Sequence, residues 1–291
     1  MRLKGVGVPA KVALAAALLA LAGPALAQES PPAPNADTSS SPGPICTDRP
    51  TKSTAPCTVP AGHFQIESDL FNFTVDETGG ADTETWLLTN PTLKYGLTDR
   101  LDIEVNWAPW QVLSERGGPT SDTRDESGVG DLFLRAKANV FGGQGNGSGG
   151  EVSVALSPFV KLPTAPRPLG NRAVEGGLIV PVNVNLPHGW AATFDPEADI
   201  DEDASGDGRH LALASLVGLS RPVSSEVTLS LELWGEENLD PAGRVEQASG
   251  DIGIAWIPKA KPWLQLDGGV NLGLNRATPA SQVYVGISRR F

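Results

Sequence analysis

The residues whose spacing is most suggestive of chemistry are four aspartates in DIDEDASGDG (199–208). Asp199, Asp201 and Asp203 occupy alternate positions and Asp207 follows, which matches the opening of a calcium-binding loop. The sixth position holds alanine instead of glycine, and the twelfth holds histidine instead of glutamate. We therefore interpret the segment as a solvated acidic external loop that bridges divalent ions loosely to other acids or to lipopolysaccharide. A calcium loop is the weaker alternative.

Hydrolysis would need a serine, a histidine and an orienting polar group. The chain has three histidines, His63, His188 and His210, and no G-x-S-x-G motif. The glycines of GGQGNGSGG (142–150) follow a predicted strand and precede no helix, so they indicate a turn instead of a nucleotide site. We expect no enzymatic activity and no cofactor, and a barrel hydrolase is the third of our functional alternatives.

Cys46 and Cys57 are the only cysteines. Both belong to a chain that we expect to be exported, where a disulfide is the usual state of a cysteine pair. Closing so short a loop contributes about 3 kcal/mol in the chain-entropy model. The spacing is not C-x-x-C, so redox catalysis is not indicated.

Most other charged residues alternate with apolar ones, which is the pattern of strands with one polar and one apolar face. In LDIEVNWAPW (101–110), Ile103 and Val105 alternate with Asp102 and Glu104. Turn residues separate twelve such runs. We predict strands at 63–75, 84–95, 101–110, 130–141, 151–162, 174–186, 190–197, 210–220, 226–236, 248–257, 262–274 and 281–291.

Short connections alternate with longer polar ones at 111–129, 163–173, 198–209 and 237–247. Bacterial outer-membrane barrels have an even number of strands, tight periplasmic turns and long external loops. We therefore predict an all-β fold, a transmembrane antiparallel up-and-down β-barrel of about 12 strands with periplasmic termini.

The tryptophans favour a barrel over a soluble sandwich, which would bury some of them in its core. In the predicted order none lies in the middle of a strand, as expected for aromatic girdles at the two membrane interfaces. The external group is Trp86, Trp107, Trp110 and Trp234, and the periplasmic group is Trp190, Trp256 and Trp263.

The polar faces of the strands should then line a wet lumen, because so many charges cannot fill a dry core unpaired. Acids outnumber bases, which suggests a weak preference for cations or neutral solutes. Pairing of these charges, which would nearly close the pore, is an open alternative, because twelve strands lie between filled and open barrels. The predicted lumen residues are Glu67, Asp69, Asp102, Glu104, Asn106, Asp131, Arg135, Lys137, Lys161, Glu175, Asn183, Asn185, Asp195, Glu226, Glu232, Asp251, Asp267, Asn271 and Arg290.

Two kinds of irregularity interrupt this scheme. The first strand changes phase between Leu70 and Phe71, which indicates a bulge. Pro91, Pro158 and Pro181 lie inside predicted strands, although a closed barrel has no free edge for a residue without an N–H.

The N-terminal region divides into three parts. Residues 1–27 combine a basic start, an apolar run and an A-x-A site, which is the pattern of a signal peptide. Residues 28–44 are rich in proline and serine and should be disordered, and residues 45–62 form a looped periplasmic segment before the barrel at 63–291. The signal holds three of the 22 basic residues and no acid, so the remainder carries 19 bases against 34 acids, a net −15. That charge argues against nucleic-acid binding.

The closing sequence SQVYVGISRRF (281–291) resembles the C-terminal assembly signal of outer-membrane barrels, with Tyr284, Gly286 and a terminal aromatic, Phe291. This resemblance implies recognition by the barrel-assembly machinery. Arg289 departs from the pattern, since a hydrophobic residue is usual there. An outward arginine near the interface costs only about 0–1 kcal/mol.

Four segments resemble a family of transporters named for the meta-cleavage pathway of phenol degradation: CTDRPTKSTAPCTVPAGHFQIES, GVGDLFLRAKANVFG, SPFVKLPTAP and QLDGGVNLGLNRATPASQVYVGISRRF. The resemblance runs from about Thr47 to Phe291. It implies an outer-membrane barrel that transports small molecules, and it brings no catalytic residues.

We therefore expect a channel for passive uptake or efflux of small solutes, with hydrophobic or aromatic compounds among the candidates. The alternative is a non-conducting structural or surface-interaction barrel whose lumen is closed by ion pairs. We further hypothesise that residues 46–62 cap or plug the periplasmic mouth, with Arg49 paired to a lumen acid. A solvated tether stapled by the disulfide is the competing interpretation.

Overall fold

Antiparallel strands dominate the computed structural model, which describes residues 43–77, 81–117, 124–143 and 151–291. The predicted signal peptide (1–27), all but the last two residues of the predicted linker (28–44) and most of the glycine-rich turn (144–150) lie outside these residues. In the part of the chain so described, no helix is long and apolar enough to cross a membrane. The one short helical element described here is a 3-10 turn, Pro187–Gly189.

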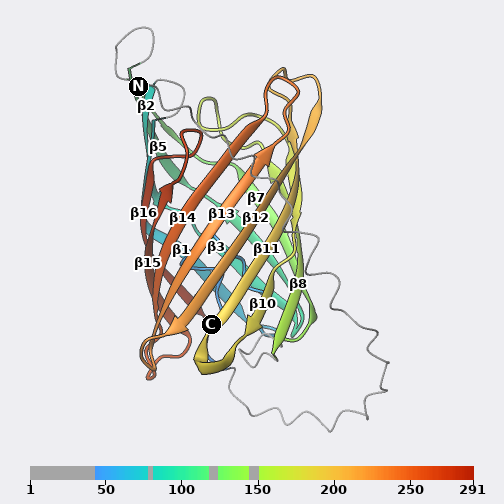
Figure 1. Cartoon of the computed structure of the whole chain (residues 1–291), viewed down its shortest axis with the longest axis vertical. Coiled ribbons are helices and arrows are strands. Elements are labelled where there is room, and N and C mark those ends of the chain that lie inside the picture. Colours follow the sequence, from blue (N-terminus) through green and yellow to red (C-terminus); the bar gives the residue numbers. More distant parts are fainter. Residues whose placement is uncertain (1–42, 78–80, 118–123, 144–150) are drawn as a thin grey trace, which may run out of the picture. The chain divides into compact units, whose positions relative to one another are not determined.

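Twelve staves form the barrel, where a stave is one strand or two consecutive strands separated by a short break. All ladders are antiparallel, and β16 pairs with β1 to close the sheet, so the predicted twelve-stranded barrel is confirmed (Figure 1). Eight staves are single strands: β1 (Phe64–Asp76), β8 (Val152–Leu162), β11 (Ala191–Glu202), β12 (Arg209–Pro222), β13 (Val227–Asn238), β14 (Val245–Trp256), β15 (Leu264–Gly273) and β16 (Ser281–Arg290). Four are split: β2 (Ala81–Thr89) with β3 (Thr92–Thr98), β4 (Leu101–Trp107) with β5 (Trp110–Gly117), β6 (Arg124–Gly128) with β7 (Leu132–Phe141), and β9 (Glu175–Ile179) with β10 (Val182–Asn185).

Prolines account for three of the four breaks, because proline cannot donate to the ladder. Pro91 separates β2 from β3, Pro109 separates β4 from β5, and Pro181 separates β9 from β10. The carbonyl groups of Pro91 and Pro181 still accept across their breaks. Trp107 N–H donates to Pro91 O at 3.2 Å, and Ala155 N–H donates to Pro181 O at 2.9 Å.

The predicted bulge in the first strand is confirmed. Asp69 pairs with Gly286 and Phe71 pairs with Val285, so Leu70 is the extra residue of the bulged strand. Pro158 lies within β8, where the β7–β8 ladder skips from Arg135↔Phe159 to Ala138↔Leu156.

Side chains alternate between the two faces of the barrel in the sense opposite to that of a soluble protein. On β13, Leu231 is 56 % exposed and its neighbour Glu232 is 6 % exposed. On β14, Ile252 is exposed and Asp251 is buried. Apolar residues outside and polar residues inside are the pattern of an outer-membrane barrel.

The staves are longer than predicted at the end opposite the C-terminus. All of β5 after Trp110 and all of β6 lie within the predicted loop 111–129, and β11 extends to Glu202. Asp199 and Asp201 are therefore strand residues paired with Ala212 and His210, and the predicted acidic loop shrinks to 203–208. The alternation of apolar and polar residues did not reveal these extensions, because the part of a strand that extends beyond the lipid needs no apolar face.

The tryptophans follow the predicted girdles only in part. Trp234 lies on the inward face of β13 with Glu232, and the Lys52 Nζ atom lies 4.2 Å from the centre of its ring, so its predicted lipid-facing position is wrong. Trp107 and Trp110 flank the break between β4 and β5, in the middle of a stave instead of at its end.

Candidate functional site in the barrel lumen

The N-terminal segment, residues 43–62, lies inside the barrel. It begins beside the C-terminus, where Ile45 N–H donates to Pro262 O at 2.7 Å and Arg290 Nη1 donates to Pro44 O at 3.4 Å. It returns to the same end, because Gly96 N–H donates to His63 O at 3.1 Å. We call this end, which carries the C-terminus and which we predict to face the periplasm, the periplasmic end.

The segment reaches well into the lumen from this end. It contacts Asp69, the sixth residue of β1, and Glu232, the sixth residue of β13. At about 3.3 Å per residue along tilted strands, these contacts lie roughly 15 Å from the periplasmic edge. The segment therefore occupies the lumen near mid-depth, deeper than a cap over the mouth.

Arg49 is held by two carboxylates from the walls. Its Nη1 donates to Asp69 Oδ1 at 2.6 Å, and its Nη2 donates to Asp267 Oδ1 at 2.8 Å. This is the pairing with a lumen acid that we hypothesised from the sequence. Burial alone would lower the pKa of Arg49, but its contacts with Asp267 and Asp69 raise it above the ordinary value.

Glycine makes room for this guanidinium. A Cβ atom at Gly286 would lie 2.0 Å from Arg49 Nη2, closer than any side chain allows. On β14, which β15 separates from β16, a Cβ atom at Gly253 would lie 2.7 Å from the Cγ of Pro50. The arginine and the following proline therefore dock against bare backbone of β16 and β14.

Asp48 joins the segment to a second part of the barrel wall, formed by β3, β4 and β7. It accepts from Lys137 Nζ at 2.6 Å and pairs with Lys94. Burial by itself would raise the pKa of the Asp48 carboxyl, but the charges of Lys137 and Lys94 outweigh it and hold that pKa below its ordinary value. Glu67 and Glu104 complete the cluster, with Lys94 Nζ 2.7 Å from Glu67 Oε1 and Lys137 Nζ 3.3 Å from Glu104 Oε1.

The tip of the segment, residues 51–54, contacts a third part of the barrel wall, formed by β11, β13 and β14. Thr54 N–H donates to Asp195 Oδ2 at 2.7 Å, and Thr51 Oγ1 donates to Glu232 Oε1 at 2.5 Å. Lys52 Nζ donates to Ser249 Oγ at 2.6 Å. Contacts on β1 and β15, on β3, β4 and β7, and on β11, β13 and β14 together surround the segment, so it spans the lumen from wall to wall.

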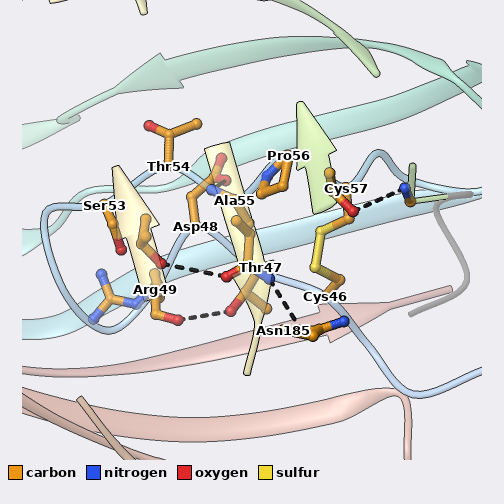
Figure 2. A pocket seen from close by; sticks show the side chains of 14 residues that line it. Cys46, Thr47, Asp48, Arg49, Ser53, Thr54, Ala55, Pro56, Cys57 and Asn185 are labelled. Atoms are coloured by element: carbon orange, nitrogen blue, oxygen red, sulfur yellow. Dashed lines mark hydrogen bonds between the residues drawn. A yellow bond between two sulfur atoms is a disulfide. The ribbon is translucent and has the colours of Figure 1, made fainter. Parts of the chain in front are cut away.

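Cys46 and Cys57 form the predicted disulfide, which joins the two arms of the segment. A cavity of about 240 Å³ lies between these arms and the periplasmic ends of β8, β10 and β11. Its walls include the disulfide and Asn185 (Figure 2). Ser153 also lines it.

Several predicted lumen residues do not contact the N-terminal segment. Lys161 Nζ lies 3.7 Å from Asp131 Oδ2 and also pairs with Glu175. Asn106 bonds to the side chains of Asn90 and Thr92 at 3.0 Å. Three further predicted lumen residues bond elsewhere. Glu226 Oε1 accepts from Lys259 N–H in the neighbouring turn at 2.6 Å, Asn271 Nδ2 donates to Gln282 Oε1 at 2.7 Å, and Asn183 Oδ1 accepts from Thr193 Oγ1 at 3.4 Å.

Asp102 and Arg135 stand behind the Asp48 cluster. Asp102 Oδ2 accepts from Val59 N–H at 2.8 Å, and Arg135 Nη1 lies 3.4 Å from Glu104 Oε2. Asp251 lies behind the tip, with its Oδ2 3.8 Å from Lys52 Nζ.

The candidate calcium loop does not form. Asp199 and Asp201 lie on an extended strand, Asp207 is exposed, and Asp203 contacts His210 Nδ1 at 3.0 Å. A calcium loop instead wraps its ligands around one point. Over the described ranges, no group of three or more His, Cys, Asp or Glu residues is arranged to hold a metal.

Lys94 is the main lumen residue that we did not predict. Its neighbours Leu93 and Tyr95 alternate with it on β3, so the period-two pattern does place it inside. The break at Pro91 hid this phase, because the stave was predicted as one continuous strand.

On the closing strand, Tyr284 and Gly286 face inward and are buried, whereas Phe291 is exposed. Arg289 points outward, and its guanidinium carbon lies 4.4 Å from the centre of the Phe291 ring. An assembly role for Tyr284, Gly286 and Phe291 stays a prediction.

The sequence from 47 to 291 matches the model of a family described as "Putative MetA-pathway of phenol degradation". The chain belongs to this family. The resemblance drawn from the sequence motifs is therefore confirmed over the whole barrel and most of the N-terminal segment. No curated protein matches the chain at a significant level.

The solved structures that share the fold include two crystallised outer-membrane proteins. An outer membrane channel from Pseudomonas putida F1 is 17 % identical, with 81 % of this chain and 97 % of that chain covered and a TM-score of 0.59. The NanC porin is 7 % identical, with 78 % and 98 % covered and a TM-score of 0.50. This chain therefore has the architecture of outer-membrane barrels.

Proposed function

We propose that the protein is a passive outer-membrane channel for small solutes whose lumen is closed at mid-depth by residues 45–62. The observation that carries the proposal is the set of contacts from this segment to three walls of the barrel. Because these contacts are ionic and buried, the docked state is closed and well defined, and solutes pass when the segment leaves it.

The contents of the lumen support a channel over a purely structural barrel. A structural barrel needs no polar core, and a buried ion pair is often no more stabilising than well-packed apolar residues. Here a separate segment fills the lumen, and two cavities remain beside it. We infer that the polar lining serves solutes or the movement of the segment.

The class of solute follows in part from charge. Beyond the segment, the inward residues Glu197 and Asp199 of β11 and Glu236 of β13 form no ion pair within the described part of the chain. Such an acidic vestibule attracts cations and repels anions. Neutral hydrophobic and aromatic compounds are further candidates, in line with the family description.

Liposome swelling and planar-bilayer conductance test the proposal. Swelling is measured with sugars, amino acids and aromatic acids for the wild type and for a variant lacking residues 45–60. We expect the deletion to raise conductance and swelling. Equal conductance of both proteins would refute closure by the segment, and no flux in either would favour the non-conducting alternative.

The partners of the barrel are also proposals. The outward apolar face fits lipid, and the acidic turn at 203–208 suits divalent ions that bridge to lipopolysaccharide. We infer that the closing strand carries the signal for the barrel-assembly machinery. Loss of insertion when the terminal Phe291 is removed would support this inference, and normal insertion would contradict it.

A further inference from the structure

Lys52, at the tip of the N-terminal segment, holds its ammonium group in a set of contacts that suits a cation. Its Nζ atom lies 4.2 Å from the centre of the Trp234 ring and donates to Ser249 Oγ at 2.6 Å. Ser249 Oγ in turn donates to Asp251 Oδ2 at 3.3 Å, and this carboxylate oxygen lies 3.8 Å from Lys52 Nζ. The ammonium thus meets an aromatic face, a hydroxyl acceptor and a carboxylate at once.

These partners belong to the barrel wall and lie next to one another on two paired strands. Trp234 on β13 is directly opposite Ser249 on β14, and Glu232 is directly opposite Asp251. Glu236, two residues beyond Trp234 on the same face of β13, brings a third carboxylate. The register of β13 with β14 therefore fixes a cation site that does not depend on the segment.

The site is open to the lumen on its external side. The side chain of Lys52 is 29 % exposed, and Trp234 and Glu236 are half-buried. Lys52 also lines a cavity of about 140 Å³ together with Asn72. Because β1 runs away from the periplasmic end, Asn72 places this cavity on the external side of the segment. A solute that enters from outside therefore reaches the lysine and the ring beneath it.

The chemistry of the site selects an organic ammonium ion. The Trp234 face attracts a cation without supplying an oxygen ligand, whereas calcium and magnesium need a full shell of oxygens. An ammonium group brings three donors, one of which Ser249 accepts. An anion would be repelled by the carboxylates, and a neutral molecule would lose their attraction. The observed occupant, a lysine side chain, is itself an alkylammonium.

We propose that Trp234, Ser249 and Asp251 form a binding site for alkylammonium solutes, which Lys52 occupies while the segment is docked. The lysine is a built-in substitute for the solute, and a solute that takes its place weakens the docking of residues 45–62. The inference rests on the proposed function, because the wild-type site becomes free only when the segment moves. It deepens that function by naming primary amines as a class of solute.

The test removes the substitute and supplies it again as a free molecule. Lys52→Ala deletes three carbons and the ammonium nitrogen, which together correspond to n-propylammonium, so this ion is the probe. Binding is measured by saturation-transfer NMR on the full chain in non-ionic detergent micelles at about pH 7, where an alkylamine is charged. We expect saturable binding to Lys52→Ala and about tenfold weaker binding to the wild type, whose tethered ammonium competes for the site. Equal binding to both proteins would overturn the proposal.

The matched ligand control is n-propanol, which has the same number of heavy atoms and no charge. In the Lys52→Ala background, Trp234→Leu should raise the apparent Kd of n-propylammonium about fivefold, as for the loss of one cation–π contact. Trp190→Leu is the matched variant control and should leave the Kd unaltered, since that ring lies 5.3 Å from the guanidinium of Arg221 and precedes β11 at the periplasmic end. Equal binding of n-propanol, or an unchanged Kd in Trp234→Leu, would contradict the site. Retained heat-modifiable gel mobility checks that each variant is folded.

Binding and flux are measured separately, so this proposal and the proposed function fail separately. If deletion of residues 45–60 opens the channel but n-propylammonium does not bind to Lys52→Ala, the site is refuted and the channel stands. If n-propylammonium binds to Lys52→Ala but neither the wild type nor the deletion variant conducts, the channel is refuted and the site stands.

Discussion

Removal of the Arg49 charge is the sharpest test of how the lumen is closed. In Arg49→Met the long aliphatic stem remains, but Asp69 and Asp267 lose their common partner. Both carboxylates are almost fully buried, at 5 % and 0 % side-chain exposure. Removal of one partner of a buried pair costs about 3–5 kcal/mol because the remaining charge is uncompensated.

That cost falls on the docked state, because undocking lets water reach both carboxylates. A shift of about 3 kcal/mol corresponds to a change of about 100-fold in the ratio of undocked to docked segment. We expect single-channel recordings in planar bilayers to show an open probability raised by about that factor, up to saturation. The unitary conductance of the open state should change little.

A neutralised variant separates charge from shape. In Arg49→Met combined with Asp69→Asn and Asp267→Asn, no uncompensated carboxylate remains, so we expect a much smaller rise than in the single variant. Arg124→Met is the surface control, since Arg124 pairs with Glu126 at 2.9 Å while 65 % exposed, and such pairs contribute about 0–1 kcal/mol. Wild-type behaviour of Arg49→Met, or equal opening of single and triple variants, would refute the reasoning.

Four further predictions concern the same lumen. Gly286→Ala should raise the open probability, because its Cβ atom would lie 2.0 Å from the docked guanidinium of Arg49. Gly250→Ala is the control and should leave the open probability unchanged, because the atoms nearest to its Cβ are 3.8 Å away. Equal currents through the two variants would contradict this prediction. Cys46→Ser, which removes a cross-link of about 3 kcal/mol, should speed proteolysis of residues 43–62, and an unchanged digestion rate would count against it. The pKa of Asp48 is lowered in the docked state. The contribution of Asp48 to docking is therefore present above its ordinary pKa of about 3.9 and is lost only as the pH falls through the lowered pKa. Asp48→Asn should thus open the channel at pH 7 and at pH 5 alike in bilayer recordings. Glu236→Gln should reduce cation preference, seen as a smaller reversal potential in a salt gradient, and an unchanged potential would argue against an acidic vestibule.

The sequence predicted the barrel well because lipid imposes a strict alternation on every strand that crosses it. Runs such as Leu229, Leu231 and Leu233 on β13 carry that signal. The same alternation places Trp234 inside, and our prediction failed there because residue chemistry was given more weight than phase. Where strands continue beyond the lipid, as at Asp199, the alternation no longer indicates a strand.

The candidate site was predictable only in outline. Both the bulge and the pairing of Arg49 with an acid could be anticipated from local pattern and charge. Which acids it meets could not, because Asp69 and Asp267 are almost 200 residues apart and come together only when the sheet closes. The hydrogen bonds from Asn271 to Gln282 and from Gln282 to Asn72 likewise join β15, β16 and β1, and nothing in the local sequence connects these strands.

The position of Arg49 has a consequence for biogenesis. Its two carboxylates and its glycine lie on β1, β15 and β16, so this one side chain straddles the seam where the first and last strands meet. The site that binds the arginine does not exist until β1 has paired with β16. During folding, the barrel must therefore close before the N-terminal segment can dock. Once docked, Arg49 stabilises the pairing of β1 with β16 from inside the lumen.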